Sequence, residues 1–191
     1  MKEQQQIVTR AKGAWLKEWG ILLATVLLSY VGMRYLTRTF AAVHVNGISM
    51  QPTYQEGACL WMKRTRAKEV VYERGDVIVV DLEEVDPLII KRVIGLPGDT
   101  IELKARVNDQ TGDVIEEVWL NGQVLDESYA NSNMGKWAVQ EQRFDVPDGH
   151  LFIMGDNRAH SMDSRALSDP YIDMDQVIGR IGTSLPAMLC R

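Results

Sequence analysis

The stretch Thr100–Val107, which reads Thr-Ile-Glu-Leu-Lys-Ala-Arg-Val, indicates the fold class because its polar and apolar residues alternate. A period of two is typical of a β-strand with one buried face and one face in water. Further along, Asn121-Gly122 separates two short apolar runs, Val118–Leu120 and Val124–Leu125. This dipeptide is the strongest short-range signal for a β-hairpin. The region is therefore predicted to form antiparallel β-structure.

Short apolar runs bounded by polar or turn residues flank this region on both sides, as in a β-domain built from many short strands. No long stretch after residue 43 has a clear period of 3.6. We therefore predict a mainly β body, with Tyr129–Gln142 as an inserted polar loop. The other predicted strands are Cys59–Met62, Asp76–Asp81, Leu88–Ile90, His150–Met154 and Val177–Ile181.

An uncharged apolar run, Trp19–Met33, precedes the β body. As a helix it would span about 22 Å, and an extension from Trp15 to Leu36 reaches about 33 Å, enough for a hydrocarbon core of ~30 Å. More positive charge precedes the run than follows it, which places the N-terminus in the cytoplasm. The predicted domains are a cytoplasmic tail at 1–18, a transmembrane anchor at 19–36 and an extracytoplasmic β-domain at 37–191.

Two alternatives to a retained anchor remain for the same run. It has a length suited to a helix buried in a protein core. It also resembles a cleavable signal peptide, because a basic segment precedes it and Thr39-Phe40-Ala41 offers a small-residue cleavage site.

Composition excludes some classes of function. The formal net charge of −5 argues against nucleic acid as a partner, because phosphate binding needs a basic surface. The two cysteines, Cys59 and Cys190, match no metal-binding spacing. Two free thiols or one disulfide between them both remain open.

A candidate nucleophile and a candidate base stand 42 positions apart, at Ser49 and Lys91. A serine hydroxyl is a poor nucleophile unless a base takes its proton. Lysine can serve as that base when it is neutral, and desolvation at an apolar site can lower its pKa by up to ~3–5 units. Lys91 lies in such a setting, between Leu88–Ile90 and Val93–Ile94. Strand alternation predicts that only one of Lys91 and Arg92 faces inward, and spacing alone does not say which.

Histidine is the more usual base, so a Ser49–His160–Asp triad is a formal alternative. His160 lies close in sequence to Asp156 and Asp163, whereas His44 has no obvious carboxylate partner.

The segments that carry Ser49, Lys91 and Gly155–Asn157 each have an ordinary structural interpretation as well. Ser49 suits a capping position in a loop, Lys91 suits an edge strand with its amine in water, and Gly155–Asn157 suits a turn after a strand.

Three blocks in this order, Ser49–Thr53, Lys91–Asp99 and Gly155–Arg165, together with Gly75–Val79, resemble bacterial type I signal peptidases of the short, single-anchor form. The resemblance runs from about the anchor to about Gly182. It implies a body of two antiparallel sheets and a serine endopeptidase of the plasma membrane that removes signal peptides from exported preproteins. It also implies no metal or cofactor, and as partners the signal peptide, the lipid bilayer and the export machinery.

The resemblance further implies the roles of individual residues. Ser49 would be the nucleophile and Lys91 the general base, with Ser161 holding the Lys91 amine by a hydrogen bond. The oxyanion hole would use the Ser49 backbone N–H. Some family members carry a second donor, a hydroxyl two residues earlier, and here Gly47 leaves that donor unassigned. The supporting residues would be Gly155, Asp156 and an Asp163–Arg165 pair, and the candidate substrate-pocket residues are Val45, Met50, Leu88 and Ile90, which ordinary core packing would also explain.

Related and unrelated functions remain as alternatives. A peptidase that matures a conjugative pilin would differ only in substrate. A self-cleaving repressor would need a DNA-binding domain in place of the anchor. A catalytically inactive anchored β-domain that binds exported proteins is the alternative from another class, and the intact Ser49 and Lys91 argue against it.

Overall fold

The structure, a computed structural model, describes residues 2–65, 71–82, 86–135 and 140–184. The chain divides into two units, an N-terminal helical unit, Met1–Phe40, and a β body, Ala41–Arg191. The two units are described separately below.

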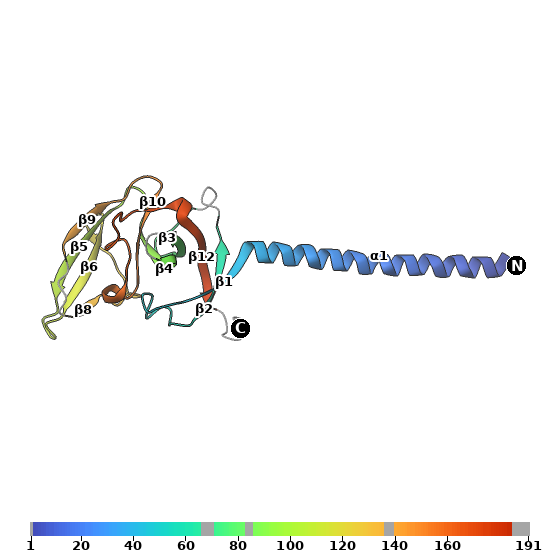
Figure 1. The fold of residues 1–191 in the computed structure, drawn as a ribbon, viewed down its shortest axis with the longest axis horizontal. Helices are drawn as coiled ribbons and strands as arrows, with labels where there is room; N and C mark the ends of the chain where they lie inside the picture. Colours follow the sequence, from blue (N-terminus) through green and yellow to red (C-terminus); the bar gives the residue numbers. More distant parts are fainter. Residues whose placement is uncertain (1, 66–70, 83–85, 136–139, 185–191) are drawn as a thin grey trace. The chain divides into compact units, whose positions relative to one another are not determined.

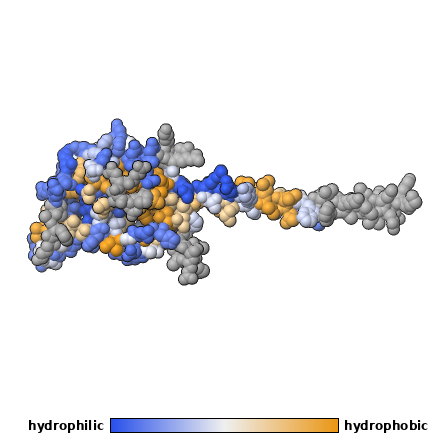
Figure 2. Space-filling model, viewed as in Figure 1, coloured by the Kyte–Doolittle hydropathy of each residue, from blue (hydrophilic) through white to orange (hydrophobic). Residues whose placement is uncertain are grey.

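The helical unit is the single helix α1 (Lys2–Thr39), which is longer than the predicted anchor (Figure 1). Its segment Glu18–Thr39 is long and apolar enough to cross a membrane, and none of it is buried in the protein. Figure 2 shows hydrophobic residues along this part of α1. The structure therefore gives no support to the alternative of a buried core helix. The boundaries at residues 18, 19 and 36 and the signal-peptide alternative stay predictions.

The β body contains two sheets, which confirms the expected fold class (Figure 1). The larger sheet has seven strands in the order β1-β2-β12-β3-β4-β10-β11, and the registers described within it are antiparallel. Its strands are β1 (Phe40–His44), β2 (Cys59–Arg64), β3 (Val77–Leu82), β4 (Asp86–Gly95), β10 (His150–Met154), β11 (Ile172–Asp173) and β12 (Val177–Ser184).

The smaller sheet has the order β7-β6-β5-β9, and β8 pairs with β6. Asn121 and Gly122 both have positive φ, 52° and 81°, as the predicted hairpin turn between β6 and β7 requires. Two 3-10 turns, η2 (Arg158–His160) and η3 (Met174–Gln176), lie in the connections of the larger sheet. The strands of the smaller sheet are β5 (Thr100–Val107), β6 (Val114–Leu120), β7 (Gln123–Val124), β8 (Asn133–Gly135) and β9 (Gln142–Asp145).

Two strands match their predicted bounds, β5 and β10, whereas others are longer or were not expected. β4 is the most important difference, because it extends beyond the predicted Leu88–Ile90 as far as Gly95. Part of the predicted loop Tyr129–Gln142 forms β8, and residues 136–139 of it lie outside the described residues.

Hydrophobic clusters bury both faces of the larger sheet around β3. Ile78 and Val80 belong to one buried cluster, and Val77 and Val79 belong to another. Successive side chains of a strand point to opposite faces, so the two clusters lie on opposite sides of the sheet. A third cluster joins β4 and β10 to the smaller sheet. A strand next to β3 therefore has little access to water on either face.

Cys59 is buried in β2 and is disulfide-bonded, so the free-thiol alternative is wrong for this residue. Cys190 lies outside the described residues.

Candidate active site

Ser49 lies in a tight turn that follows β1. Gly47 has a φ of +92°, a left-handed conformation that side-chain-bearing residues rarely adopt. Backbone hydrogen bonds from Gln51 N to Ile48 O, 3.1 Å, and from Tyr54 N to Met50 O, 2.9 Å, close the turn. Met50 is buried in the core cluster with Val45 and Leu60 and anchors the turn to the sheet. The turn geometry explains why glycine, rather than a hydroxyl-bearing residue, stands at position 47.

Lys91 projects from β4 toward this turn. Its Nζ donates hydrogen bonds to Ser49 Oγ, at 2.9 Å, and to the Ile90 carbonyl, at 3.1 Å. The Lys91 residue is only 4% exposed. Burial is the main cause that lowers the pKa of its amine below the usual value for lysine, and the charge of Asp163 opposes this shift. The arrangement brings the candidate nucleophile and the candidate base into direct contact.

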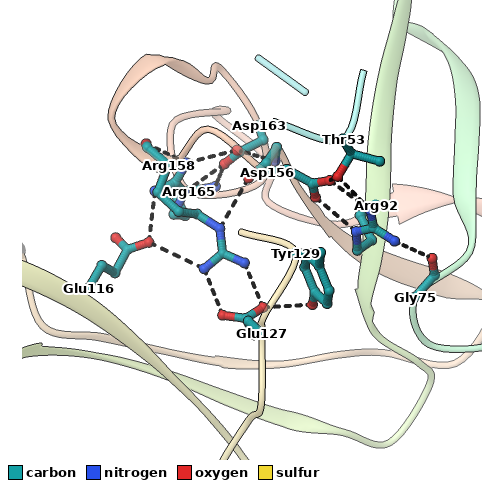
Figure 3. Close-up of polar contacts among 11 residues, drawn as sticks. Thr53, Gly75, Arg92, Glu116, Glu127, Tyr129, Asp156, Arg158, Asp163 and Arg165 are labelled. Carbon is teal, nitrogen blue, oxygen red and sulfur yellow. Dashed lines mark hydrogen bonds and ion pairs between the residues drawn. The ribbon is translucent and has the colours of Figure 1, made fainter. Parts of the chain in front are cut away.

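Arg92, the next residue on β4, is also buried, which corrects the expectation that only one of the two faces inward. Both faces of the sheet are covered at β4, so alternation separates the two side chains without exposing either of them. The Arg92 guanidinium forms a bidentate ion pair with Asp156, with N–O distances of 2.8 and 2.6 Å. It also donates to the Gly75 carbonyl at 2.8 Å, and its carbon lies 4.0 Å from the centre of the Tyr129 ring (Figure 3). The hydroxyl of Thr53, in the nucleophile turn, donates to the same Asp156 carboxylate.

Asp163 and Arg165 form the pair that the resemblance implies. Arg165 Nε and Nη2 each donate to the Asp163 carboxylate at 2.8 Å, and Gly155 N donates to it at the same distance. Burial alone would raise the pKa of the Asp163 carboxyl, but these hydrogen bonds and the Arg165 charge lower it below the usual value. Asp163 is therefore an anion at neutral pH.

Buried charges extend from this pair to the smaller sheet (Figure 3). Arg165 Nη1 donates to Glu116 of β6 at 2.8 Å. Arg158 of η2, whose side chain is fully buried, lies 3.9 Å from Glu116 and donates to both oxygens of Glu127 at 2.9 and 2.5 Å. Glu127 also accepts a hydrogen bond from the Tyr129 hydroxyl at 2.9 Å. Alternating charges thus connect the loop after β10 with β6 and with the segment that precedes β8.

Gly155 permits the loop after β10 to approach the nucleophile turn. A Cβ at this position would lie 2.2 Å from Ser161 Oγ and 2.6 Å from the Ser49 carbonyl oxygen, closer than real Cβ contacts. Ser161 Oγ is buried and makes no hydrogen bond of good geometry among the described residues, although its hydroxyl lies near Asp163 and helps to lower the pKa of that carboxyl. The hydrogen bond expected between Ser161 and Lys91 is absent from this part of the chain in the structure, so that role stays a prediction.

A cleft of about 640 Å³ opens beside Ser49 and Lys91. The candidate pocket residues, Val45, Met50, Leu88 and Ile90, all line it, although Val45 and Met50 are also core residues. His160 lines the cleft as well, and its Nδ1 lies 3.3 Å from Asn157 Oδ1. The Ser49 hydroxyl contacts Lys91, so the geometry favours lysine over the histidine triad.

Sequence reasoning missed several charged residues of the site. Glu116 was detectable, because it is in phase with the buried Val118 along β6. Glu127 and Arg158 carry no comparable signal, because they are partners that lie 31 residues apart in the chain.

Comparison with known proteins gives the following similarities. A family model described as signal peptidase, peptidase S26, matches residues 16–185. Signal peptidase I S of Bacillus subtilis (strain 168) is 35% identical over 159 residues, which cover 78% of this chain and 77% of that protein. Signal peptidase IB of Staphylococcus aureus (strain N315) is 32% identical over 183 residues, 87% of each chain. A crystal structure of a signal peptidase I from Enterococcus faecalis V583 is 27% identical with a TM-score of 0.44, and it covers 59% of this chain and 98% of that one.

Proposed function

This chain belongs to the signal peptidase family, peptidase S26, and we propose that it removes signal peptides with Ser49 as nucleophile and Lys91 as general base. It is a serine endopeptidase, a hydrolase acting on preproteins that carry N-terminal signal peptides. The observation that carries the residue assignment is the 2.9 Å hydrogen bond between Lys91 Nζ and Ser49 Oγ. The same contact argues against an inactive binding domain.

The proposed reaction begins with neutral Lys91. Its Nζ lone pair takes the Ser49 proton while Ser49 Oγ attacks the scissile carbonyl. The Ser49 N–H stabilises the oxyanion of the tetrahedral intermediate. Protonated Lys91 then gives its proton to the leaving amine of the mature protein, which leaves the signal peptide as an ester on Ser49. Lys91 next deprotonates a water that attacks this ester, and its return of the proton to Ser49 Oγ releases the signal peptide.

The surroundings of Lys91 support its role as a base. A general base works best when its pKa lies near the working pH, and burial lowers the pKa of Lys91 toward that range. The charge of Asp163 opposes this shift and raises the pKa of Lys91. Arg165, which makes a bidentate contact with Asp163, offsets part of that effect because its own charge lowers the pKa of Lys91.

The cleft supports an extended substrate beside β4. Its walls come from residues 42–50 on one side and from Leu88–Lys91 on the other. A peptide laid along a strand pairs by its backbone and presents alternate side chains to pockets. We assign Val45, Met50, Leu88 and Ile90 to the pockets for the small side chains at positions −1 and −3 of the signal peptide.

The apolar segment of α1 suggests a membrane-anchored enzyme. We propose a single span at 19–36, with residues 1–18 in the cytoplasm and the catalytic β-domain, 37–191, on the outer face of the plasma membrane. The excess of positive charge before the span supports this orientation. The lipid bilayer, and the export machinery that delivers preproteins, would then be its partners.

Incubation of the full chain in detergent with a purified preprotein tests the proposed function. We expect cleavage after a small residue at the end of the signal peptide, read by sequencing the new N-terminus. Ser49→Ala and Lys91→Ala should each abolish it. Undiminished cleavage by either variant would overturn the assignment of the dyad.

A further inference from the structure

Asn157 contacts both peptide groups that flank the nucleophile. Its backbone N–H donates to the Ser49 carbonyl at 2.9 Å, and its side-chain Nδ2 donates to the Ile48 carbonyl at 3.2 Å. Asn157 is only 7% exposed, and it lies between the ion-paired Asp156 and Arg158. The nucleophile turn is thus held by a residue that the rest of the loop after β10 keeps in place.

The Ile48 carbonyl and the Ser49 N–H belong to one planar peptide group. Any hydrogen bond that fixes the direction of the carbonyl therefore fixes the direction of the N–H, which points the opposite way. The Ile48 oxygen accepts from Gln51 N as well, at 3.1 Å, so it has two donors. Donation to a carbonyl also polarises the amide and strengthens its N–H as a donor. The Ser49 N–H itself makes none of the backbone hydrogen bonds found in the described turns and loops.

His160 completes the chain of contacts. The end of the Asn157 amide that faces Ile48 must be the nitrogen, because a carbonyl oxygen cannot donate. The Oδ1 end then faces His160 Nδ1, at 3.3 Å, which must carry its proton to donate. The contacts run from His160 through the Asn157 amide to the Ile48–Ser49 peptide. They give His160 a role that does not involve taking a proton from serine.

We propose that Asn157 is a positioning residue that aims the Ser49 N–H at the oxyanion, with His160 orienting the Asn157 amide. The inference rests on the proposed function of Ser49 and Lys91. The direction of the Ser49 N–H matters more in this chain than in a protein that has a hydroxyl two residues before the nucleophile. Gly47 has no side chain to share the oxyanion, so the Ser49 N–H bears more of its charge.

Two ligands separate this role from a purely structural one. A substrate-derived peptide aldehyde forms a hemiacetal with Ser49, and its oxygen occupies the oxyanion position. The cleaved signal peptide product binds the same cleft without such an oxygen. The variants are Asn157→Ala and Asn157→Asp, which both remove the Nδ2 donor, and His160→Ala. Asn131→Ala is the matched control, because among the described residues its side-chain Oδ1 accepts a hydrogen bond only from the nearby Asn133 N, at 3.3 Å.

Removal of a direct oxyanion donor costs about 10²–10³ in kcat, so an indirect effect of about 10–100-fold is expected for both Asn157 variants. KM and the affinity for the product peptide should change less than about twofold, whereas the affinity for the aldehyde should fall in parallel with kcat. His160→Ala should lower kcat about two- to fivefold, and Asn131→Ala should match the unsubstituted protein. In Asn157→Ala the pH dependence should keep its position, because the charges around Lys91 are unchanged. In Asn157→Asp the added carboxylate should move the acid limb to higher pH, because a nearby anion raises the pKa of an amine.

Wild-type kcat and aldehyde affinity in both Asn157 variants would overturn the inference. A loss shared equally by kcat, product binding and thermal stability would also overturn it, because it would show a structural role alone. An unsubstituted protein that neither cleaves preprotein nor binds the aldehyde would instead refute the proposed function, and the inference with it. Asn157→Asp keeps the size of the side chain, so the test remains decisive if Asn157→Ala does not fold.

Discussion

Lys91 Nζ lies 2.9 Å from Ser49 Oγ although the two residues stand on different segments, one on the interior strand β4 and one in the turn after β1. Two features hold this contact. Met50 packs the turn into the core, and neighbouring strands bury the lysine on both sides. The burial that keeps water from Lys91 also lowers the pKa of its amine. The same packing thus positions the candidate base and adjusts its basicity.

Substitution of Lys91 by arginine is expected to abolish preprotein cleavage. Arginine stays protonated at any working pH and has no lone pair to take the Ser49 proton. The rate should fall by at least the ~10²–10⁴-fold that general base catalysis contributes. Initial rates of preprotein cleavage provide the measurement. Lys63→Arg, at an exposed position of β2, is the control and should retain full activity. Activity retained in Lys91→Arg would show that another residue is the base.

Cleavage is expected to speed up as the pH rises from acid toward mildly alkaline values. The pKa of Lys91 is lowered by burial, so the reactive neutral amine becomes populated at a lower pH than for an exposed lysine. The apparent pKa in a plot of kcat/KM against pH should lie below the usual value for lysine. The protein itself binds fewer protons at Lys91 than the unfolded chain does, so this residue makes stability rise with pH between the two pKa values. An acid optimum for cleavage would contradict the assignment.

Asp163→Asn is expected to move the acid limb of that profile to lower pH. The Asp163 carboxylate raises the pKa of Lys91, so its neutralisation removes this effect and leaves the lowering effect of Arg165. The maximal rate should also fall, because the contact between Gly155 N and the carboxylate is weakened. Measurement of kcat/KM across a range of pH separates the shift of the acid limb from the fall in the maximal rate. An acid limb that stays in place would show that Asp163 has no electrostatic influence on Lys91.

Glu116→Ala is expected to destabilise the fold by about 1–3 kcal/mol, because it leaves one buried nitrogen of Arg165 without a partner while Asp163 still balances the charge. Glu117→Ala is a matched control on the same strand. Its carboxylate pairs with Arg106 at the surface, and exposed pairs contribute about 0–1 kcal/mol. Denaturant unfolding of the two variants provides the comparison. Equal losses of stability would show that the buried charges between the sheets are not important for folding.

Sequence patterns predicted the local structure better than the contacts between distant segments. The alternation in Thr100–Val107 and the Asn121-Gly122 turn act over a few residues, and both are confirmed. The prediction for Lys91 and Arg92 failed because alternation assigns a side chain to a face without saying what covers that face. Here the Tyr129 ring and the Asp156 carboxylate cover Arg92, and both come from distant parts of the chain.

The same difference between local patterns and contacts of distant segments applies to the site. Lys91 was identified because a lysine between apolar residues is unusual, and Ser49 because its segment and two others, in this order, resemble the signal peptidase family. Asn157 gave no such signal, because an asparagine after Gly-Asp suits an ordinary turn. Its contacts with the Ile48 and Ser49 carbonyls depend on how the loop after β10 lies against the turn after β1, and only the structure shows that.

Gly155→Ala is expected to remove most activity, even though the change adds a single methyl group. The added Cβ would meet Ser161 Oγ at 2.2 Å and the Ser49 carbonyl at 2.6 Å, so either the loop or the nucleophile turn must shift. Overpacking of this kind costs about 1–3 kcal/mol of stability, and a shift of about 1 Å at the reacting atoms costs about 10²-fold in rate. Gly182→Ala is the control, because a Cβ there meets nothing within 4 Å. Thermal unfolding and cleavage rates of both variants provide the measurement, and near-normal activity in Gly155→Ala would show that the loop yields without disturbing Ser49.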